Sequence, residues 1–312
     1  MKCWYNYGDG YLAEKYSLRA VTNSDSEARA NLNRAISARL FKRDFRLSSA
    51  IVEKLLHDHA EEFLPGELEY FFGIICSDLD DEEVALRYFK VAYERFEFEN
   101  DPQVYALIRG QYAHILYMTD FTEEALQMCR EFERVSRFVS LAEVSFGFSV
   151  KAGILEDLNR QREAIASLRK ALRFIRKAKM WLEIFEPAYL VRLGRNLLDL
   201  GKTNTALETL RKIRYPIKSQ SLERDYYYVT AYALFHNTRY AQAIVPFETF
   251  LKLLEVDFPD DVRNIEHKKY LAYALVHGGQ PERARPFIED ILADSRASEE
   301  DRAWFSKLLE KT

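Results

Sequence analysis

The sequence is poor in the two residue types that most often form turns. It contains 11 glycines and 8 prolines among 312 residues, which is about half of the usual share of each. Sandwiches, barrels and propellers need a turn roughly every 8–12 residues. The composition therefore argues against a fold built from many short strands.

Cysteine is also scarce. Cys3, Cys76 and Cys129 are odd in number and widely spaced, and no CxxC pair occurs. A disulfide framework or a cysteine-based zinc site needs cysteines in suitably spaced groups, so we expect neither. Because free cysteines suit a reducing compartment, the sequence predicts a cytoplasmic protein.

Long apolar runs are missing as well. Residues 1–10 contain no continuous apolar stretch of the kind found in a secretory signal. The longest apolar runs, such as residues 70–76, fall far short of the roughly 18 residues that span a bilayer. The net charge of −4 and the pI near 6.0 give no general attraction to nucleic acid or anionic lipid. We therefore expect no membrane insertion, and the overall charge disfavours a nucleic-acid partner.

Motifs that carry catalysis are absent too. No HExxH, GxxxxGK[ST], GxGxxG or GxSxG occurs. The six histidines include one close pair, His57 and His59, but residues two apart on a helix point to different faces, so the pair cannot hold one metal ion. The acidic run at 80–83 falls where a helix is expected to begin, and the helix dipole explains it. We therefore expect no enzymatic activity, no metal and no cofactor.

The sequence does contain a repeat with a period of about 40 residues. A small residue is followed 12 positions later by alanine, and bulky apolar residues follow near positions 16 and 19. Small residues on two antiparallel helices let the backbones approach to about 8–10 Å, so each copy predicts one helix pair. The six pairs of small residues are Gly73 and Ala85, Ala113 and Ala125, Ala152 and Ala164, Gly194 and Ala206, Ala231 and Ala243, and Ala272 and Ala284.

Short polar segments separate the two helices of each predicted pair. Each segment is only a few residues long, and such a short connection forces the two helices to run antiparallel. The expected turns are 78–82, 118–122, 157–162, 200–204, 236–240 and 277–281.

The repeat resembles the tetratricopeptide repeat (TPR), in which small residues occupy positions 8 and 20, an aromatic often position 24 and alanine position 27. Gly73, Ala85, Phe89 and Ala92 match at all four. The resemblance covers residues 66–292, although the tryptophan at position 4 and the closing proline are missing. It implies an all-α, right-handed α-solenoid of stacked antiparallel helix pairs, with about 14–15 helices. Long-repeat members include kinesin-light-chain-type adaptors and the helical sensor domains of Gram-positive peptide-pheromone receptors.

The chain is expected to form one TPR-like domain over residues 1–312. Its degenerate N-terminal helices would occupy residues 1–65. A capping box at 24–27 opens a helix that runs to about Phe41, and a second helix follows over 45–57. Ser48 or Ala50 would lie at the crossing of these two helices.

The C-terminal end, residues 293–312, is expected to form a capping helix. It would begin at Ser298, because Asp301 completes a capping pattern. The apolar residues expected on one of its faces are Ala303, Trp304, Leu308 and Leu309. In the two preceding pairs, Pro246 and Pro286 fall inside the second helices and should kink them.

The TPR resemblance also implies a ligand groove on the first helix of each pair. In that family the second, fifth, ninth, twelfth and thirteenth positions typically face the ligand. The residues in the corresponding positions that we predict to line a partner-binding groove are Tyr70, His114, Tyr117, Arg195, Asp199, Tyr228, Tyr232, His236, Lys269, Tyr273 and His277. The last six form two stripes spaced four residues apart. Tyrosine and histidine offer rigid contact area for binding; packing between helices is the alternative.

Charge is unevenly distributed along the chain. Residues 61–157 contain 21 acidic and 8 basic side chains, whereas residues 160–218 contain 15 basic and 5 acidic ones. The basic segment predicts a docking surface for an acidic protein segment, with nucleic acid as the weaker alternative, formed by Arg169, Lys170, Arg173, Arg176 and Lys177. The alternative is a solvated outer face opposite the apolar stripe Ala164, Ile165, Leu168, Ala171, Leu172 and Ile175.

Taken together, these patterns predict a non-enzymatic scaffold that presents a concave aromatic and charged groove to a protein or peptide segment. The alternative is a regulatory module whose superhelix changes pitch when a small ligand or signal peptide binds. The sequence leaves self-association open.

Overall fold

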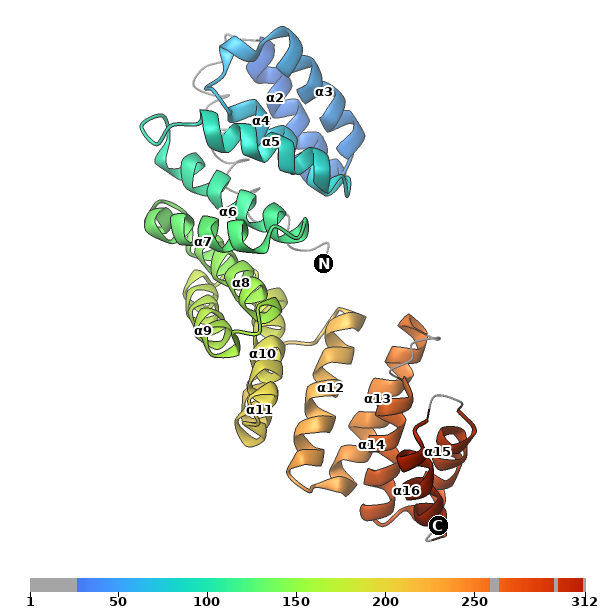
Figure 1. The fold of residues 1–312 in the computed structure, drawn as a ribbon. Helices are drawn as coiled ribbons and strands as arrows, with labels where there is room; N and C mark the ends of the chain where they lie inside the picture. Colours follow the sequence, from blue (N-terminus) through green and yellow to red (C-terminus); the bar gives the residue numbers. More distant parts are fainter. Residues whose placement is uncertain (1–26, 259–263, 295–296, 311–312) are drawn as a thin grey trace. The chain divides into compact units, whose positions relative to one another are not determined.

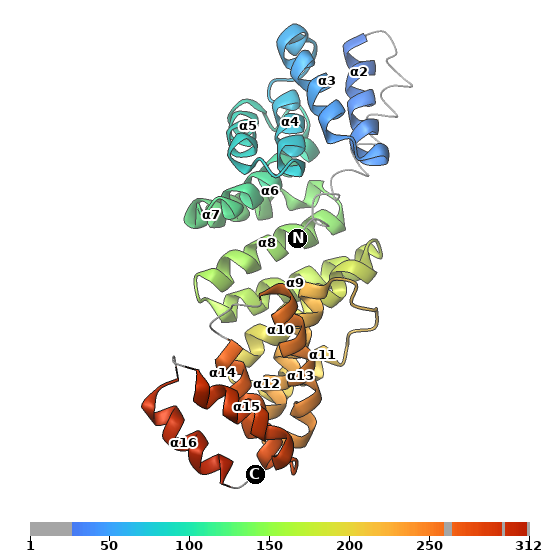
Figure 2. The same cartoon turned by 90° about the vertical axis from the view of Figure 1, so that its right-hand side faces the viewer.

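The computed structural model describes residues 27–258, 264–294 and 297–310 (Figures 1 and 2). Within these ranges the chain forms fifteen α-helices and no strand, which confirms the all-α prediction. None of the described helices is long and apolar enough to cross a membrane.

The helices group into two compact units. Unit 1 comprises residues 1–160 and 173–180, and unit 2 comprises residues 161–172 and 181–312, so the helix α9 contributes to both. The prediction of one continuous domain stays a prediction. The helices of unit 1 are α2 (Glu27–Ser37), α3 (Phe45–Asp58), α4 (Glu67–Asp78), α5 (Glu82–Arg95), α6 (Pro102–Met118), α7 (Thr122–Val135) and α8 (Leu141–Asp157). The helix divided between the units is α9 (Gln161–Ala178).

Unit 2 continues the same arrangement of paired helices. Each first helix packs on the second helix of its pair and, through that helix or directly, on the next pair. The helices of unit 2 are α10 (Leu182–Asp199), α11 (Thr203–Leu210), α12 (Gln220–His236), α13 (Tyr240–Asp257), α14 (Asn264–His277), α15 (Pro281–Ala293) and α16 (Glu299–Leu309). The predicted pairs α4–α5, α6–α7, α10–α11, α12–α13 and α14–α15 are therefore confirmed, while α8 and α9 follow each other in the chain through the same short turn.

All six predicted turns have the same backbone conformation. Three residues separate the two helices of each pair, and the second of the three always has a positive φ. The N–H of the third residue donates to a carbonyl five residues earlier, as Asp81 does to Cys76. This is the Schellman pattern, which satisfies the last carbonyls of the first helix. The left-handed residues are Asp80, Asp120, Asn159, Gly201, Thr238 and Gly279.

The repeated small residues lie at the helix crossings, as predicted. The alanine at the second position of every pair has no exposed surface. A methyl group added at Gly73 would lie 3.1 Å from the ring of Phe89. Phe132 of α7 is wedged between two glycines, since added methyl groups at Gly110 and Gly147 would meet opposite edges of its ring. The two helices of a pair can approach closely at these points only because the residues there are small.

The N-terminal helices differ in one respect from the prediction. The α-helix ends at Ser37 and continues as a π-helical segment over Ala38–Lys42, whereas a helix to about Phe41 was expected. Ser48 lies at the crossing, where its hydroxyl donates to the carbonyl of Ala35 at 2.9 Å, and Ala50 is exposed. The first three residues of the predicted capping box, 24–26, lie outside the described residues.

The C-terminal helix α16 begins at the predicted capping box. Ser298 Oγ accepts from the N–H of Asp301 at 3.0 Å, and the Asp301 carboxylate accepts from the N–H of Ser298 at 3.3 Å. The predicted apolar face is wrong in part. Phe305 and Leu308 are buried, while Ala303 and Trp304 are exposed, because α16 packs on α15 through the stripe that contains residues 305 and 308.

Candidate functional site

Eight of the predicted groove residues lie in unit 2, on the first helices of three successive pairs. These helices are α10, α12 and α14 (Figure 2). The residues are Arg195 and Asp199 on α10, Tyr228, Tyr232 and His236 on α12, and Lys269, Tyr273 and His277 on α14.

An aromatic network joins α12 to α14. The rings of Tyr228 and Tyr232 have centroids 4.7 Å apart, and Tyr232 lies 4.9 Å from Tyr270 on the next first helix. Phe235 lies 5.3 Å from Tyr273 in an edge-on arrangement. Such edge-to-face contacts add stability beyond the apolar area that they bury. The network thus fixes the surface on which the predicted groove residues stand.

Tyr232 belongs to the interior of this network. Its side chain is buried, and its hydroxyl lies 2.6 Å from Nδ1 of His267. Its ring also packs edge-on against Phe247 of α13. Burial raises the pKa of Tyr232 above the ordinary range of tyrosine, so the phenol stays neutral. The prediction that Tyr232 lines an open groove is therefore wrong, since its contacts place it between helices.

The C-terminal ends of α12 and α14 carry the accessible part of the network. His236 and His277 are exposed, and Tyr273 is half-buried. The Tyr273 ring lies 4.1 Å from His277 on one side, and it stacks on Trp304 of α16 at 5.6 Å with an interplanar angle of 7°. We call the accessible rings the aromatic face, which comprises Tyr228, His236, Tyr273, His277 and Trp304.

Charged side chains border the aromatic face. The Arg195 guanidinium lies 5.1 Å from the ring centroid of Tyr228 and 3.7 Å from the carboxylate of Asp225. Asp199, one turn along α10, is exposed. A guanidinium over a tyrosine ring forms a favourable cation–π contact. Positive and negative charges therefore both lie next to Tyr228.

Lys269 is held by two carboxylates. Its ammonium group donates to Glu266 at 2.6 Å and to Asp301 of α16 at 2.7 Å. Burial disfavours the charge of Lys269, but the hydrogen bonds to Asp301 and Glu266 outweigh that effect and raise its pKa. Lys269 is therefore a structural link between α14 and α16 as well as a surface charge.

Three predicted groove residues lie in unit 1, on α4 and α6. Tyr70 is only 1% exposed and packs against Phe71 and Phe89, so the prediction that it contacts a ligand is wrong. His114 packs on Phe146 at 5.4 Å, and burial lowers its pKa to about 4, which leaves its imidazole uncharged at neutral pH. Tyr117 is half-buried.

The basic residues predicted on α9 are all exposed, and the six apolar residues of the predicted stripe are all buried. This arrangement fits a docking surface and a solvated outer face alike. The exposed basic residues are Arg169, Lys170, Arg173, Arg176 and Lys177.

Metal-binding groups are absent from the described part of the chain: no three His, Cys, Asp or Glu side chains there could hold one ion. Cys76 and Cys129 are free and buried. Burial raises the pKa of each thiol to about 12, so both side chains stay protonated at neutral pH.

Sequence reasoning missed several members of the aromatic network. Tyr240 begins α13 and lies 5.4 Å from Tyr273, and Trp304 was assigned to the buried face of the capping helix. His267 and Tyr270 precede Tyr273 by six and three residues on α14. Tyr270 could have been found from its i+3 spacing to Tyr273 on one helix.

The sequence matches no protein-family model and no curated protein, but many solved structures share the fold. One is a chain of the APC/C hetero-tetramer Cut9–Hcn1, with a TM-score of 0.55 and 15% identity over 97% of this chain. This chain spans only 52% of that one.

Two further solved structures are matched over nearly their whole lengths. The C-terminal part of a TPR repeat-containing protein from Cytophaga hutchinsonii has a TM-score of 0.54 and 12% identity, over 88% of this chain and 98% of that one. A Rap protein complexed with competence and sporulation factor has a TM-score of 0.52 and 16% identity, over 98% and 94%. This chain therefore has the fold of the tetratricopeptide-repeat superfamily.

Proposed function

We propose that the chain is a non-enzymatic scaffold that binds a segment of a partner protein or peptide on the aromatic face of unit 2. The observation that carries this proposal is the row of accessible rings on successive first helices, held in place by a buried network and bordered by charge. With its free, buried thiols, the scaffold would act in the cytoplasm.

The physical basis of binding would be the rigidity of the face. Tyrosine and tryptophan lose little conformational entropy on contact and bury much surface, so they often dominate binding energy at interfaces. His236, His277 and Trp304 are the most accessible members. Arg195 and Asp199 would add selectivity, because each favours an opposite charge on the partner.

Lys269 would contribute little to the binding of an acidic group on the partner. Its ammonium group already donates to Glu266 and Asp301, so a carboxylate on a partner would have to compete with two intramolecular ones. We therefore assign the main attraction for acidic groups to Arg195, whose side chain is half exposed and lies 3.7 Å from a single carboxylate, that of Asp225.

Partner capture tests this proposal. Tyr228→Ala combined with Trp304→Ala truncates two rings of the face, and we expect at least tenfold weaker binding, since interface aromatic anchors cost about 2 kcal/mol or more when truncated. Phe121→Ala is the matched control, because Phe121 is an exposed aromatic in unit 1. Equal capture by the double variant and the control, with unchanged circular dichroism, would reject the aromatic face.

A sensor is the second candidate function. The observation that favours it is the likeness to a Rap protein whose structure was solved with competence and sporulation factor. A regulatory module of this kind would change the pitch of its helical stack when a small ligand or signal peptide binds. X-ray scattering with and without candidate peptides separates the two functions, because a passive scaffold would keep its radius of gyration.

The exposed basic residues of α9 would serve as a second docking surface, for an acidic segment. Screening by salt weakens attraction between exposed charges. This role predicts that partner affinity falls as ionic strength rises and is lower still in Lys170→Glu. If neither change alters the affinity, these residues form a solvated outer face.

A further inference from the structure

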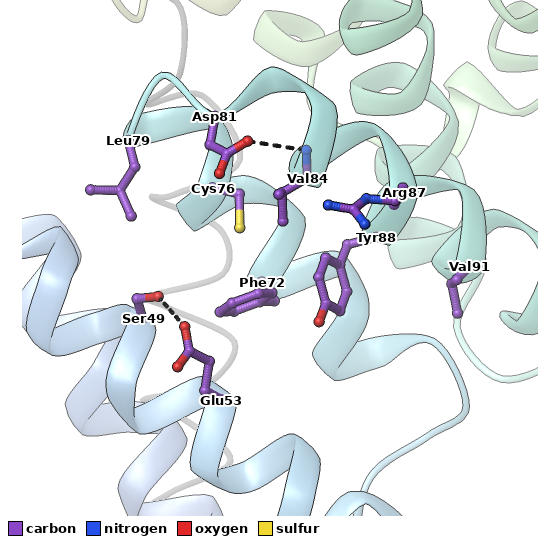
Figure 3. A pocket seen from close by; sticks show the side chains of 10 residues that line it. All are labelled: Ser49, Glu53, Phe72, Cys76, Leu79, Asp81, Val84, Arg87, Tyr88 and Val91. Carbon is purple, nitrogen blue, oxygen red and sulfur yellow. Dashed lines mark hydrogen bonds between the residues drawn. The ribbon is translucent and has the colours of Figure 1, made fainter.

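Unit 1 contains a half-open pocket of about 680 Å³ between α3, α4 and α5 (Figure 3). Helices α3, α4 and α5 of unit 1 line this pocket. The aromatic face proposed above is formed by helices of unit 2, so the two sites share no residue. The lining residues of the pocket are Ser49 and Glu53 of α3, Phe72 and Cys76 of α4, Leu79 and Asp81 of the turn, and Val84, Arg87, Tyr88 and Val91 of α5.

The base of the pocket is apolar and aromatic. The rings of Phe72 and Tyr88 meet edge-to-face with centroids 4.6 Å apart, and Cys76 stands next to Phe72 in the centre of Figure 3. The thiol is neutral, because burial raises the pKa of Cys76 to about 12. At the rim Leu79 is 40% exposed. The apolar part of a ligand side chain could therefore pack against this base.

Charged groups stand on opposite walls of the pocket. Glu53 rises from α3, where its carboxylate accepts from the Ser49 hydroxyl at 2.9 Å, and Arg87 reaches in from α5 (Figure 3). Asp81 caps α5 by accepting from the N–H of Val84 at 3.2 Å. Two carboxylates, those of Glu53 and Asp81, thus stand against one cation, Arg87, among the residues that line the pocket.

We propose that this pocket binds the side chain of an arginine from a partner peptide. The arginine stem is apolar and would cover Cys76 and Val84, as long charged side chains do when their heads stay polar. Its planar guanidinium would lie over the half-buried ring of Tyr88 and pair with the carboxylate of Glu53.

The charges of the walls complement this occupant and disfavour others. An anionic head group would meet Glu53 and Asp81, and a purely apolar side chain would cover both carboxylates without offering either a further donor. Arg87, on the opposite wall, would repel the positive charge of the bound arginine. Glu53 and Arg87 are thus predicted to influence the same ligand with opposite signs, which a merely structural role of either residue would not produce.

Two probe peptides test the proposal, acetyl-Leu-Arg-Leu-amide and its citrulline analogue, which keeps the shape and removes the charge. Titration is followed by the backbone amide resonances of Cys76, Val84 and Tyr88 in the full chain. We expect the arginine peptide to shift these resonances. Glu53→Gln should weaken its binding about threefold to fivefold, and Arg87→Gln should strengthen it by a similar factor.

Matched variants and competitors give the outcomes that would overturn the proposal. Glu94→Gln and Lys90→Gln make the same charge changes on α5 outside the pocket lining and should leave the affinity unchanged. The proposal fails if citrulline binds as well as arginine, if Glu53→Gln has no effect, or if no probe binds at millimolar concentration. Free L-arginine that binds as tightly as the peptide would assign the pocket to a small molecule, and self-association lost in Glu53→Gln would assign it to a second copy.

Discussion

At the scale of single residues, the turns are the most regular feature of this chain. Each contains one residue in the left-handed region of φ, a conformation that costs an L-residue about 1–2 kcal/mol and that glycine, asparagine and aspartate adopt most readily. Five of the six positions carry one of these three residue types. The sixth is Thr238, with φ of 58°, and its β-branched side chain is the least suited to that conformation.

Replacing Thr238 should therefore stabilise the protein. Thr238→Gly removes the strain but gives the unfolded chain more freedom, and we expect a net gain of about 0.5–1 kcal/mol in the free energy of unfolding. Thr238 is exposed and its hydroxyl bonds only its neighbour's carbonyl, so little else is lost. Urea denaturation should show a higher midpoint with an unchanged slope.

Thr249→Gly is the matched control. Thr249 lies inside α13 with helical geometry, and its hydroxyl donates to the carbonyl of Val245. Glycine there should lower the free energy of unfolding by about 1 kcal/mol. A loss of stability in both variants would show that the left-handed turn residue stores no strain.

At the scale of helices, α16 is attached to unit 2 by apolar contacts, by hydrogen bonds from Arg302 to the carbonyls of Leu292 and Asp294 at 3.1 and 2.7 Å, and by Asp301. Phe305 and Leu308 are its buried residues. Asp301 adds a hydrogen bond from Lys269 at 2.7 Å while it also caps its own helix. Because Asp301 both accepts from Lys269 and caps its own helix, part of the attachment should depend on the charge of Asp301.

This dependence should appear as a loss of α16 protection in acid. Hydrogen bonds from Lys269 and Ser298 lower the pKa of Asp301 below its ordinary value of 3.8. A carboxylate with a lowered pKa stabilises the folded form above its unfolded pKa and loses that effect as the pH falls through the folded one. Amide protection of Phe305 and Leu308 should therefore decline below about pH 4.

Asp301→Asn should remove most of this pH dependence and leave protection low throughout. Glu300→Gln, one residue earlier on the same helix turn, is the control and should keep the acid-sensitive profile. If Asp301→Asn retained the decline, a different group would govern the attachment of α16.

The helices themselves could largely be predicted from the sequence, because their signals are local. A small residue, an alanine 12 positions later and a polar turn between them require no knowledge of distant neighbours, and in all six cases two helices joined by a three-residue turn formed where that pattern indicated. The π-helical segment over Ala38–Lys42 has no comparable local signal. The buried face of α16 was missed because Phe305 and Trp304 are adjacent, and only the packing on α15 decides which of the two is covered.

At the scale of the whole molecule, the accessible site was harder to predict than the fold. Tyr70 and Tyr273 both stand at predicted ligand-facing positions of first helices, yet one is a core residue and the other stacks on Trp304. Whether such a tyrosine is buried or accessible depends on the side chains of the neighbouring helices that pack against it. Tyr232 likewise became internal because His267, 35 residues later, supplies a partner for its hydroxyl.

Stacked repeats also determine how far a local disturbance travels. Each pair contacts mainly its neighbours, so stability is close to a sum of local terms. Gly147→Ala places a methyl group against Phe132 Cε1, an overpacking that should cost about 1–3 kcal/mol. Hydrogen exchange should accelerate in α6, α7 and α8, which meet at that ring, and stay unchanged in α12 to α15.

Gly110→Ala separates this steric effect from the general effect of a methyl group on a helix. Its added carbon would lie 3.2 Å from the other edge of the same ring, a contact that a small shift relieves. We expect a smaller loss of stability, confined to the same three helices. If hydrogen exchange also accelerated in α12 to α15 in either variant, the chain would open as one cooperative unit. When stability depends only on contacts between neighbouring pairs, a local clash does not affect such distant helices.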